Sequence, residues 1–132
     1  MRQYFNIAEI GSVPRSIVKR PPPPAGISFF GNARVLTNII VSLFLERFPK
    51  LKIVSVENGV GWVPFMLETL EYQMQEARIK YTIPPFELFR RQIYACSWFE
   101  RRNFPASARM LGVDNVLFET DFPHPTCLYR TH

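Results

Sequence analysis

The sequence predicts an α/β fold with parallel strands. Strand-like and helix-like segments alternate along the chain in the order strand, helix, strand, helix, strand, helix, strand, which is typical of repeated βα units. The strand-like segments are also apolar at successive positions, as expected for strands buried on both faces of a parallel sheet. No internal repeat beyond the βα unit is evident in the sequence.

The first βα unit covers roughly the first 50 residues. "YFNIAEI" (4–10) is predicted to be a strand that ends at Gly11 and Ser12. Residues 13–28 are predicted to be a loop, because four consecutive prolines at 21–24 disfavour a helix or a central strand. A helix is predicted over about 32–48, with Asn32 as a possible cap, and apolar residues recur in it at helical spacing.

The remaining units follow the same order. "LKIVSVE" (51–57) is rich in β-branched residues and predicts a strand, followed by a turn and a helix over about 62–80. The segment "PPFELFRR" is predicted to be a short turn before the strand 92–99. A short helix over 104–111, closed by Gly112, then leads to the fourth strand, 115–122.

Composition restricts the class of protein. A chain of 132 residues with 47% hydrophobic residues is long and apolar enough for a single domain, predicted to span 1–132. The net charge of +5 comes from scattered Lys and Arg residues, which disfavours a nucleic-acid partner. No apolar run approaches the ~20 residues of a membrane span. Two cysteines without a CxxC motif favour a reduced, cytoplasmic compartment.

Three predicted strands each carry an acid near their C-terminal end: Glu9, Glu57 and Asp121. Side chains alternate along a strand, so Asp121 shares a face with Leu117 and Glu119, and Glu57 shares one with Ser55. Parallel α/β proteins place their chemistry at the C-terminal strand ends. Because buried carboxylates are costly unless they are paired or bound to a metal, these acids indicate a cation or proton-transfer site.

Each of these acids can also be explained by a structural role instead of a functional one. Asp121 is compatible with a turn residue before Phe-Pro, and Glu57 and Glu9 with hydrogen bonding to loop backbone. Glu119 is compatible with pairing to an interior arginine. His124 lies between two prolines, three residues after Asp121, and fits either a surface position or a place beside the site.

Two long motifs, "RFPKLKIVSVENGVGWVPFMLE" (47–68) and "LGVDNVLFETDFPHPT" (111–126), resemble the amidohydrolase-related family of metal-dependent hydrolases and decarboxylases. "LFRRQIY" (88–94) and "EIGS" (9–12) extend the resemblance over nearly the whole chain. The resemblance implies a (β/α)8 barrel with a divalent metal, often zinc, at the C-terminal mouth. Small aromatic or carboxylic compounds would be the substrates of such an enzyme.

The resemblance assigns roles to particular residues. Asp121 matches the family's eighth-strand Asp, which is a metal ligand and a proton shuttle. Glu9 stands where the fifth-strand His metal ligand would be, and Glu57 where the sixth-strand His would be. The HxH pair of the first strand is absent, and neither His124 nor His132 takes the place of a family imidazole.

These matches predict one half of a TIM barrel, equivalent to strands 5–8, with the final helix absent. A whole barrel takes about 250 residues, so the missing half is expected before Met1 or in another chain. We therefore expect a metal-dependent hydrolase or decarboxylase that is inactive as this fragment alone. The alternative is a non-catalytic half-barrel that self-associates or serves as an interaction module, because an open half-barrel leaves sheet edges and an apolar face uncovered.

Overall fold

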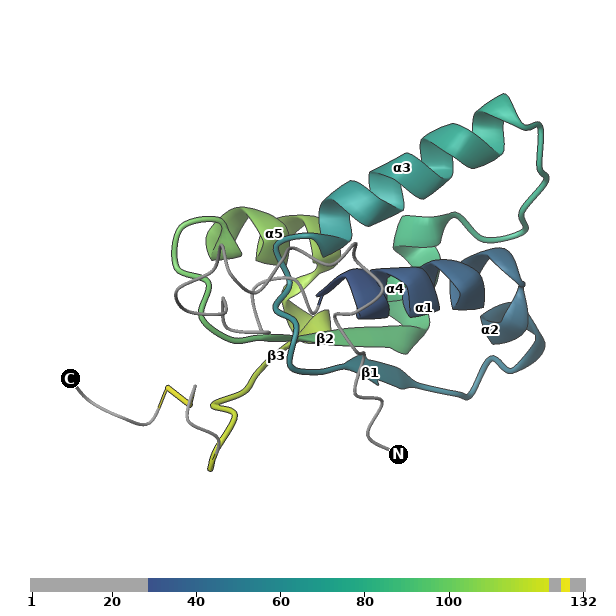
Figure 1. Cartoon of the computed structure of the whole chain (residues 1–132). Coiled ribbons are helices and arrows are strands. Elements are labelled where there is room, and N and C mark those ends of the chain that lie inside the picture. Colours follow the sequence, from purple (N-terminus) through teal and green to yellow (C-terminus); the bar gives the residue numbers. More distant parts are fainter. Residues whose placement is uncertain (1–28, 124–126, 129–132) are drawn as a thin grey trace, which may run out of the picture.

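A computed structural model describes residues 29–123, 127 and 128. Three parallel strands form one sheet in the order β1 (Ile53–Ser55), β2 (Ile93–Ser97), β3 (Val116–Phe118). The helices gather on one side of this sheet (Figure 1). The α/β fold with parallel strands is thereby confirmed for this part of the chain. The predicted strand 4–10 and loop 13–28 lie outside the described residues.

The register of the sheet shows which residues lie on each of its two faces. Ser55 is in register with Ala95, and Ala95 with Val116. Ala95 is buried in the core and Val116 packs against it, so these positions face the helices. Val54 and Leu117, at the alternate positions, are exposed on the opposite face. One face of the sheet is therefore covered by helices and the other carries exposed apolar side chains.

The predicted helix 32–48 is two helices, α1 (Phe29–Val41) and α2 (Phe44–Arg47). The break comes at Leu43, whose φ of 58° lies in the left-handed region and interrupts the helical path. The prediction that Asn32 caps the helix is wrong, because Asn32 lies inside α1. Its side-chain amide instead donates hydrogen bonds to Ser55 Oγ (3.0 Å) and to the Val56 carbonyl (3.2 Å), which attaches α1 to the end of β1.

The two later predicted helices are present. α3 (Val63–Glu76) is shorter than the predicted 62–80 and ends before Arg78, whose φ is 52°. α5 (Phe104–Leu111) has the predicted bounds. Gly112 follows it with a φ of 100°, a conformation that favours glycine, and a 3₁₀ turn, η3 (Val113–Asn115), leads into β3.

The segment predicted as the turn "PPFELFRR" is a helix, α4 (Pro85–Gln92), so that prediction is wrong. Pro85 occupies the first helical position, where its fixed φ and missing N–H are tolerated. Leu88, Phe89 and Gln92 then lie buried on one side, while Glu87 forms an ion pair with Arg91 on the other. The two prolines thus start a helix instead of preventing one.

The helices and the covered face of the sheet share one hydrophobic core. Its buried members come from α1, α2, α3, α4, α5, the β1–α3 loop and β2: Leu36, Ile40, Leu45, Val60, Val63, Met66, Leu67, Leu70, Leu88, Phe89, Ile93, Ala95 and Leu111. Among the described residues, no helix combines the length and the apolar character that crossing a bilayer requires.

Candidate active site

The carboxyl ends of β1, β2 and β3 meet at one edge of the sheet, because the strands are parallel. All three strands are shorter than predicted: 53–55 in place of 51–57, 93–97 in place of 92–99, and 116–118 in place of 115–122. Glu57, Glu119 and Asp121 consequently lie in the segments just beyond the strands. These segments form the described part of the candidate site.

Glu119 lies at the centre of this edge. Its Oε1 accepts a hydrogen bond from the backbone N–H of Glu57 (2.7 Å), and its own backbone N–H donates to the Ser97 carbonyl (3.0 Å). Burial raises the pKa of Glu119 above its ordinary value of 4.5, and the negative charges of Glu57 and Asp121 raise it further. The hydrogen bonds of Glu119 in the described part of the chain involve Glu57, Ser97 and Cys96, whereas the structural interpretation expected an interior arginine.

The thiol of Cys96 is the second partner of Glu119. Cys96 is in register with Leu117 and lies on the sheet face turned away from the helices. Burial, together with the charge and the hydrogen bond of Glu119, raises the pKa of this thiol to about 11. Cys96 is therefore a neutral hydrogen-bond donor to the carboxylate and not a thiolate nucleophile at neutral pH.

Glu57 comes close to the other acids, but not by the predicted geometry. Ser55, expected on the same inner face, is buried on the helix side and bonded to Asn32. Glu57 has a φ of 62°, so strict strand alternation does not extend to it. The left-handed conformation turns its backbone N–H toward Glu119.

Asp121 is half-buried and has a φ of 59°, which Asp tolerates better than most residues. It lies in the segment after β3 and not at the last position of the strand. The carbonyl of the preceding residue, Thr120, accepts a hydrogen bond from the backbone N–H of Leu128 (2.9 Å), so Leu128 lies beside this edge. Glu9, His124 and His132 lie outside the described residues.

A further acid, Glu100, organises this edge and was not identified from the sequence. Its carboxylate accepts hydrogen bonds from the backbone N–H groups of Val60, Gly61 (3.0 Å) and Trp98 (3.0 Å). It thereby joins the loop after β1 to the loop after β2. The sequence signal for this contact is Gly59 of "NGVG", since a Cβ at that position would overlap the Glu100 carboxylate.

The donor chemistry of the described residues suits a hard cation only in part. Glu57, Glu119 and Asp121 interact through their charges, but no three His, Cys, Asp or Glu side chains in residues 29–123, 127 and 128 are arranged to hold a metal ion. The described residues thus do not complete a metal site by themselves.

The comparisons with known proteins agree with this fold. The amidohydrolase family model matches residues 31–127. An amidohydrolase from Mycobacterium avium subsp. paratuberculosis is similar in structure, with a TM-score of 0.67 and 31% identity over 73% of this chain and 25% of that one. The 5-carboxyvanillate decarboxylase from Sphingomonas paucimobilis is also similar, with a TM-score of 0.57 and 30% identity over 66% of this chain and 28% of that one. Among curated proteins, none matches.

The chain therefore belongs to the amidohydrolase family, as the two sequence motifs indicated. Members of this family generally use a divalent metal. The chain spans about a quarter of the length of the two solved relatives.

Proposed function

We propose that this chain forms part of the catalytic barrel of a metal-dependent hydrolase or decarboxylase that acts on small carboxylic or aromatic compounds. The observation that carries the proposal is the convergence of Glu57, Glu119 and Asp121 at the C-terminal edge of a parallel sheet. This edge is where barrels of this class place their chemistry. The name of one similar protein, 5-carboxyvanillate decarboxylase, supports this class of substrate.

The proposal assigns the four strands of the chain, the predicted one included, to barrel strands 5–8. Asp121 and Glu9 would hold the metal, Asp121 would also accept a proton during the reaction, and Glu57 and His124 would lie near the substrate. The metal, which we take to be zinc, would polarise a substrate carbonyl or carboxyl group when bound. A cytoplasmic location is part of the same proposal, because the chain has only two cysteines and no CxxC motif.

Catalysis requires the rest of a barrel, since the matched relatives are about four times longer than the segment they share with this chain. The remainder would come from a longer polypeptide or from a partner chain. We expect the 132 residues alone to turn over no substrate. A chimera in which residues 31–127 replace the matching segment of the mycobacterial amidohydrolase is the sharper test, because it supplies the other strands.

The test compares Asp121→Ala with Asp114→Ala in this chimera. Asp114 is an exposed acid in η3 and provides a control with the same change in charge. The expected result is zinc retention and 5-carboxyvanillate decarboxylation or ester hydrolysis in the parent and in Asp114→Ala, with both lost in Asp121→Ala. Equal zinc content and activity in the two variants would contradict the assignment of Asp121.

The alternative function is a non-catalytic half-barrel that self-associates or serves as an interaction module. It is favoured by the sheet face opposite the helices, where Val54 and Leu117 are both exposed. Sedimentation velocity tests it with Val54→Asp against Phe65→Asp, an equally polar change on the exposed side of α3. Association that Val54→Asp abolishes and Phe65→Asp leaves unchanged would support the alternative, and a monomer at all concentrations would oppose it.

A further inference from the structure

A second surface lies at the opposite end of β1 from the candidate site. It is a groove formed by α2 and the loop that leads into β1, and the residues lining it are Phe44, Arg47, Phe48, Pro49, Lys50 and Leu51. We call this surface the α2 groove. Its volume is about 620 Å³.

The backbone of the α2 groove is fixed by contacts to the rest of the fold. Gln92, which is buried at the end of α4, donates hydrogen bonds from Nε2 to the carbonyls of Phe48 (2.9 Å) and Leu51 (3.1 Å). Lys52 Nζ donates to the Arg91 carbonyl. Leu45 of α2 is fully buried in the core. The core and the end of α4 therefore hold the backbone of the α2 groove in place.

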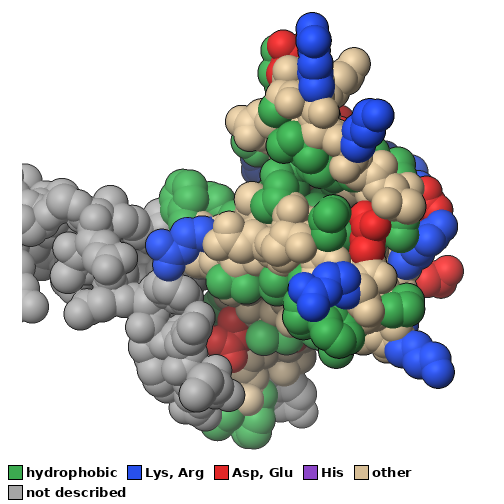
Figure 2. All heavy atoms as spheres, turned by 90° about the vertical axis from the view of Figure 1, so that its right-hand side faces the viewer, with side chains coloured by type: hydrophobic (Ala, Val, Ile, Leu, Met, Phe, Trp, Pro, Cys, Tyr) green, Lys and Arg blue, Asp and Glu red, His purple; other side chains and the backbone are tan. Residues whose placement is uncertain are grey.

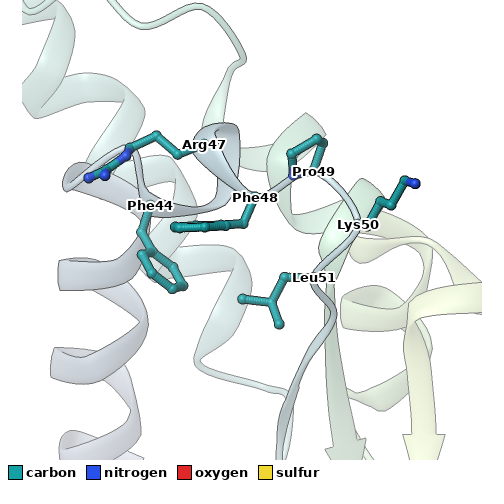
Figure 3. Close-up of a pocket in the computed structure, with 6 residues that line it drawn as sticks. All are labelled: Phe44, Arg47, Phe48, Pro49, Lys50 and Leu51. Carbon is teal, nitrogen blue, oxygen red and sulfur yellow. The ribbon is translucent and has the colours of Figure 1, made fainter.

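The floor of the α2 groove is apolar and open to solvent. Phe44, Phe48 and Leu51 are 37%, 47% and 40% exposed, and the two phenyl rings are 5.0 Å apart. Figure 3 shows these three side chains turned toward one another across the hollow. An exposed cluster of large apolar side chains in a concave surface is a feature of interaction sites.

Positive charge flanks this floor. Figure 3 shows Arg47 and Lys50 pointing away from the hollow on its two sides. None of the six lining residues is acidic. The Arg47 guanidinium lies 5.8 Å from the centre of the Phe48 ring, so this charge lies close to the apolar floor. Seen from the side on which α2 lies, hydrophobic side chains reach the surface among Lys and Arg side chains, with some Asp and Glu side chains on the same face (Figure 2).

We propose that the α2 groove is a docking site for an acidic, amphipathic peptide segment of a partner protein. The hollow can seat apolar side chains from one face of such a segment, and the flanking cations can pair with carboxylates on either side of that face. A membrane surface fits less well, because Phe44, Phe48 and Leu51 turn into a hollow and do not protrude. A second copy of this chain fits less well, because it carries a net charge of +5.

This inference does not rest on the proposed enzymatic function. The α2 groove precedes β1, whereas Glu57 follows it, and six residues of extended chain separate Leu51 from Glu57 by roughly 20 Å. Occupation of the groove thus leaves the candidate active site accessible. Loss of peptide binding and loss of metal or activity would be separate results.

The experiment measures fluorescence anisotropy of a labelled synthetic helix with Leu and Phe on one face and Glu on the other, added to the full 132-residue chain. The charge-reversal pair Arg47→Glu and Lys50→Glu is compared with Arg101→Glu and Arg102→Glu, two exposed arginines outside the groove that give the same net charge. We expect saturable binding that weakens by about tenfold in the groove variant and little in the control. Binding should also weaken between ~0.05 M and ~0.5 M salt, as charge screening increases.

A third variant, Phe48→Ser, tests the apolar floor without changing the charge. Circular dichroism confirms that each variant is folded before binding is compared. Equal losses in the two charge-reversal variants would overturn the proposal, since they would show attraction to net charge alone. Groove-dependent binding to anionic phosphatidylserine vesicles without peptide binding, or groove-dependent dimerisation of the chain, would also overturn it.

Discussion

Oε1 of Glu119 lies 2.7 Å from the backbone nitrogen of Glu57, so one carboxylate connects the segments that follow β3 and β1. These strands are not neighbours, because β2 lies between them in the sheet. Strands in a sheet are about 4.8 Å apart, and the Glu119 side chain therefore reaches across the end of the middle strand. This contact determines where the loop carrying Glu57 lies relative to Asp121.

Replacing Glu119 should change the dependence of stability on pH. Because burial and the neighbouring acids raise its pKa in the folded protein, the folded state binds a proton at Glu119 more readily than the unfolded state does. The stability that this group contributes is full below its ordinary pKa of 4.5 and is lost as the pH rises through the raised value. The free energy of unfolding of the wild type, relative to Glu119→Gln, should therefore fall as the pH increases from about 4 toward neutrality.

Urea unfolding at several pH values measures this difference. Glu68→Gln provides the control, because Glu68 is an exposed acid of α3 and should show no such trend. A wild type that gains stability relative to Glu119→Gln with rising pH would contradict the expected direction.

The two thiols should react at different rates. Burial and the adjacent Glu119 raise the pKa of Cys96 to about 11, so it holds almost no thiolate at neutral pH, and its side chain is buried. Cys127 is half-buried. At pH 8, iodoacetamide should modify Cys127 and spare Cys96, as read by peptide mass spectrometry. Addition of urea should make both residues reactive, and comparable modification of both in the folded protein would contradict the burial of Cys96.

The sequence predicted the order of the elements well because apolar periodicity is a local property. The bounds 104–111 of α5, closed by Gly112, were predicted correctly from a short apolar pattern and a glycine with a recognised role. α4 was missed because Pro84 and Pro85 suggested a turn, although proline is also favoured at the start of a helix. Leu88 and Phe89 of this helix are buried in the core, and such tertiary contacts are not visible in a local sequence pattern.

The candidate site was less predictable than the fold. Strand alternation correctly put Leu117 on the face opposite the helices, because it lies within β3. It failed between Ser55 and Glu57, since the left-handed backbone at Glu57 ends the alternation. The contacts of Glu100 link residues about 40 positions apart, and no pattern of spacing in one sequence indicates which backbone groups such an acid will bind.

Even a small change to the side-chain amide of Asn115 should lower the free energy of unfolding. It is buried, and its Nδ2 donates hydrogen bonds to the carbonyls of Arg90 (3.0 Å) and Ile93 (2.8 Å), which joins the start of β3 to the end of α4. Asn115→Asp replaces the donor with an oxygen that faces these carbonyls. We expect a loss of about 3 kcal/mol or more in the free energy of unfolding, because a buried charge would then lack a partner.

Chemical denaturation of Asn115→Asp at pH 7 measures the effect, with Asn115→Ala as a second variant that removes the donor without adding a charge. Asn115→Ala should cost less than Asn115→Asp. The order would be reversed if the side-chain amide were not the group that makes these contacts.

Glu100 should contribute more to stability than an acid on the outside of the fold. Removing its carboxylate in Glu100→Ala leaves the backbone N–H groups of Val60, Gly61 and Trp98 without that acceptor. Each unsatisfied buried group costs about 1–3 kcal/mol, reduced where water can reach it, so we expect a total loss of about 2–4 kcal/mol. Gly59→Ala should also destabilise the fold, because the added Cβ overlaps the same carboxylate and the φ of 67° disfavours other residues.

The double variant Glu100→Ala with Gly59→Ala distinguishes this account from two independent effects. Once the carboxylate is absent, the added Cβ no longer overlaps it, while the backbone penalty at Gly59 remains. The double variant should therefore be more stable than the sum of the two single losses predicts, by roughly 1 kcal/mol or more. Urea unfolding of all four proteins measures the coupling, with Glu68→Ala on α3 as the control acid. Strict additivity would show that Glu100 and Gly59 do not meet, and the loop after β1 would then need another anchor.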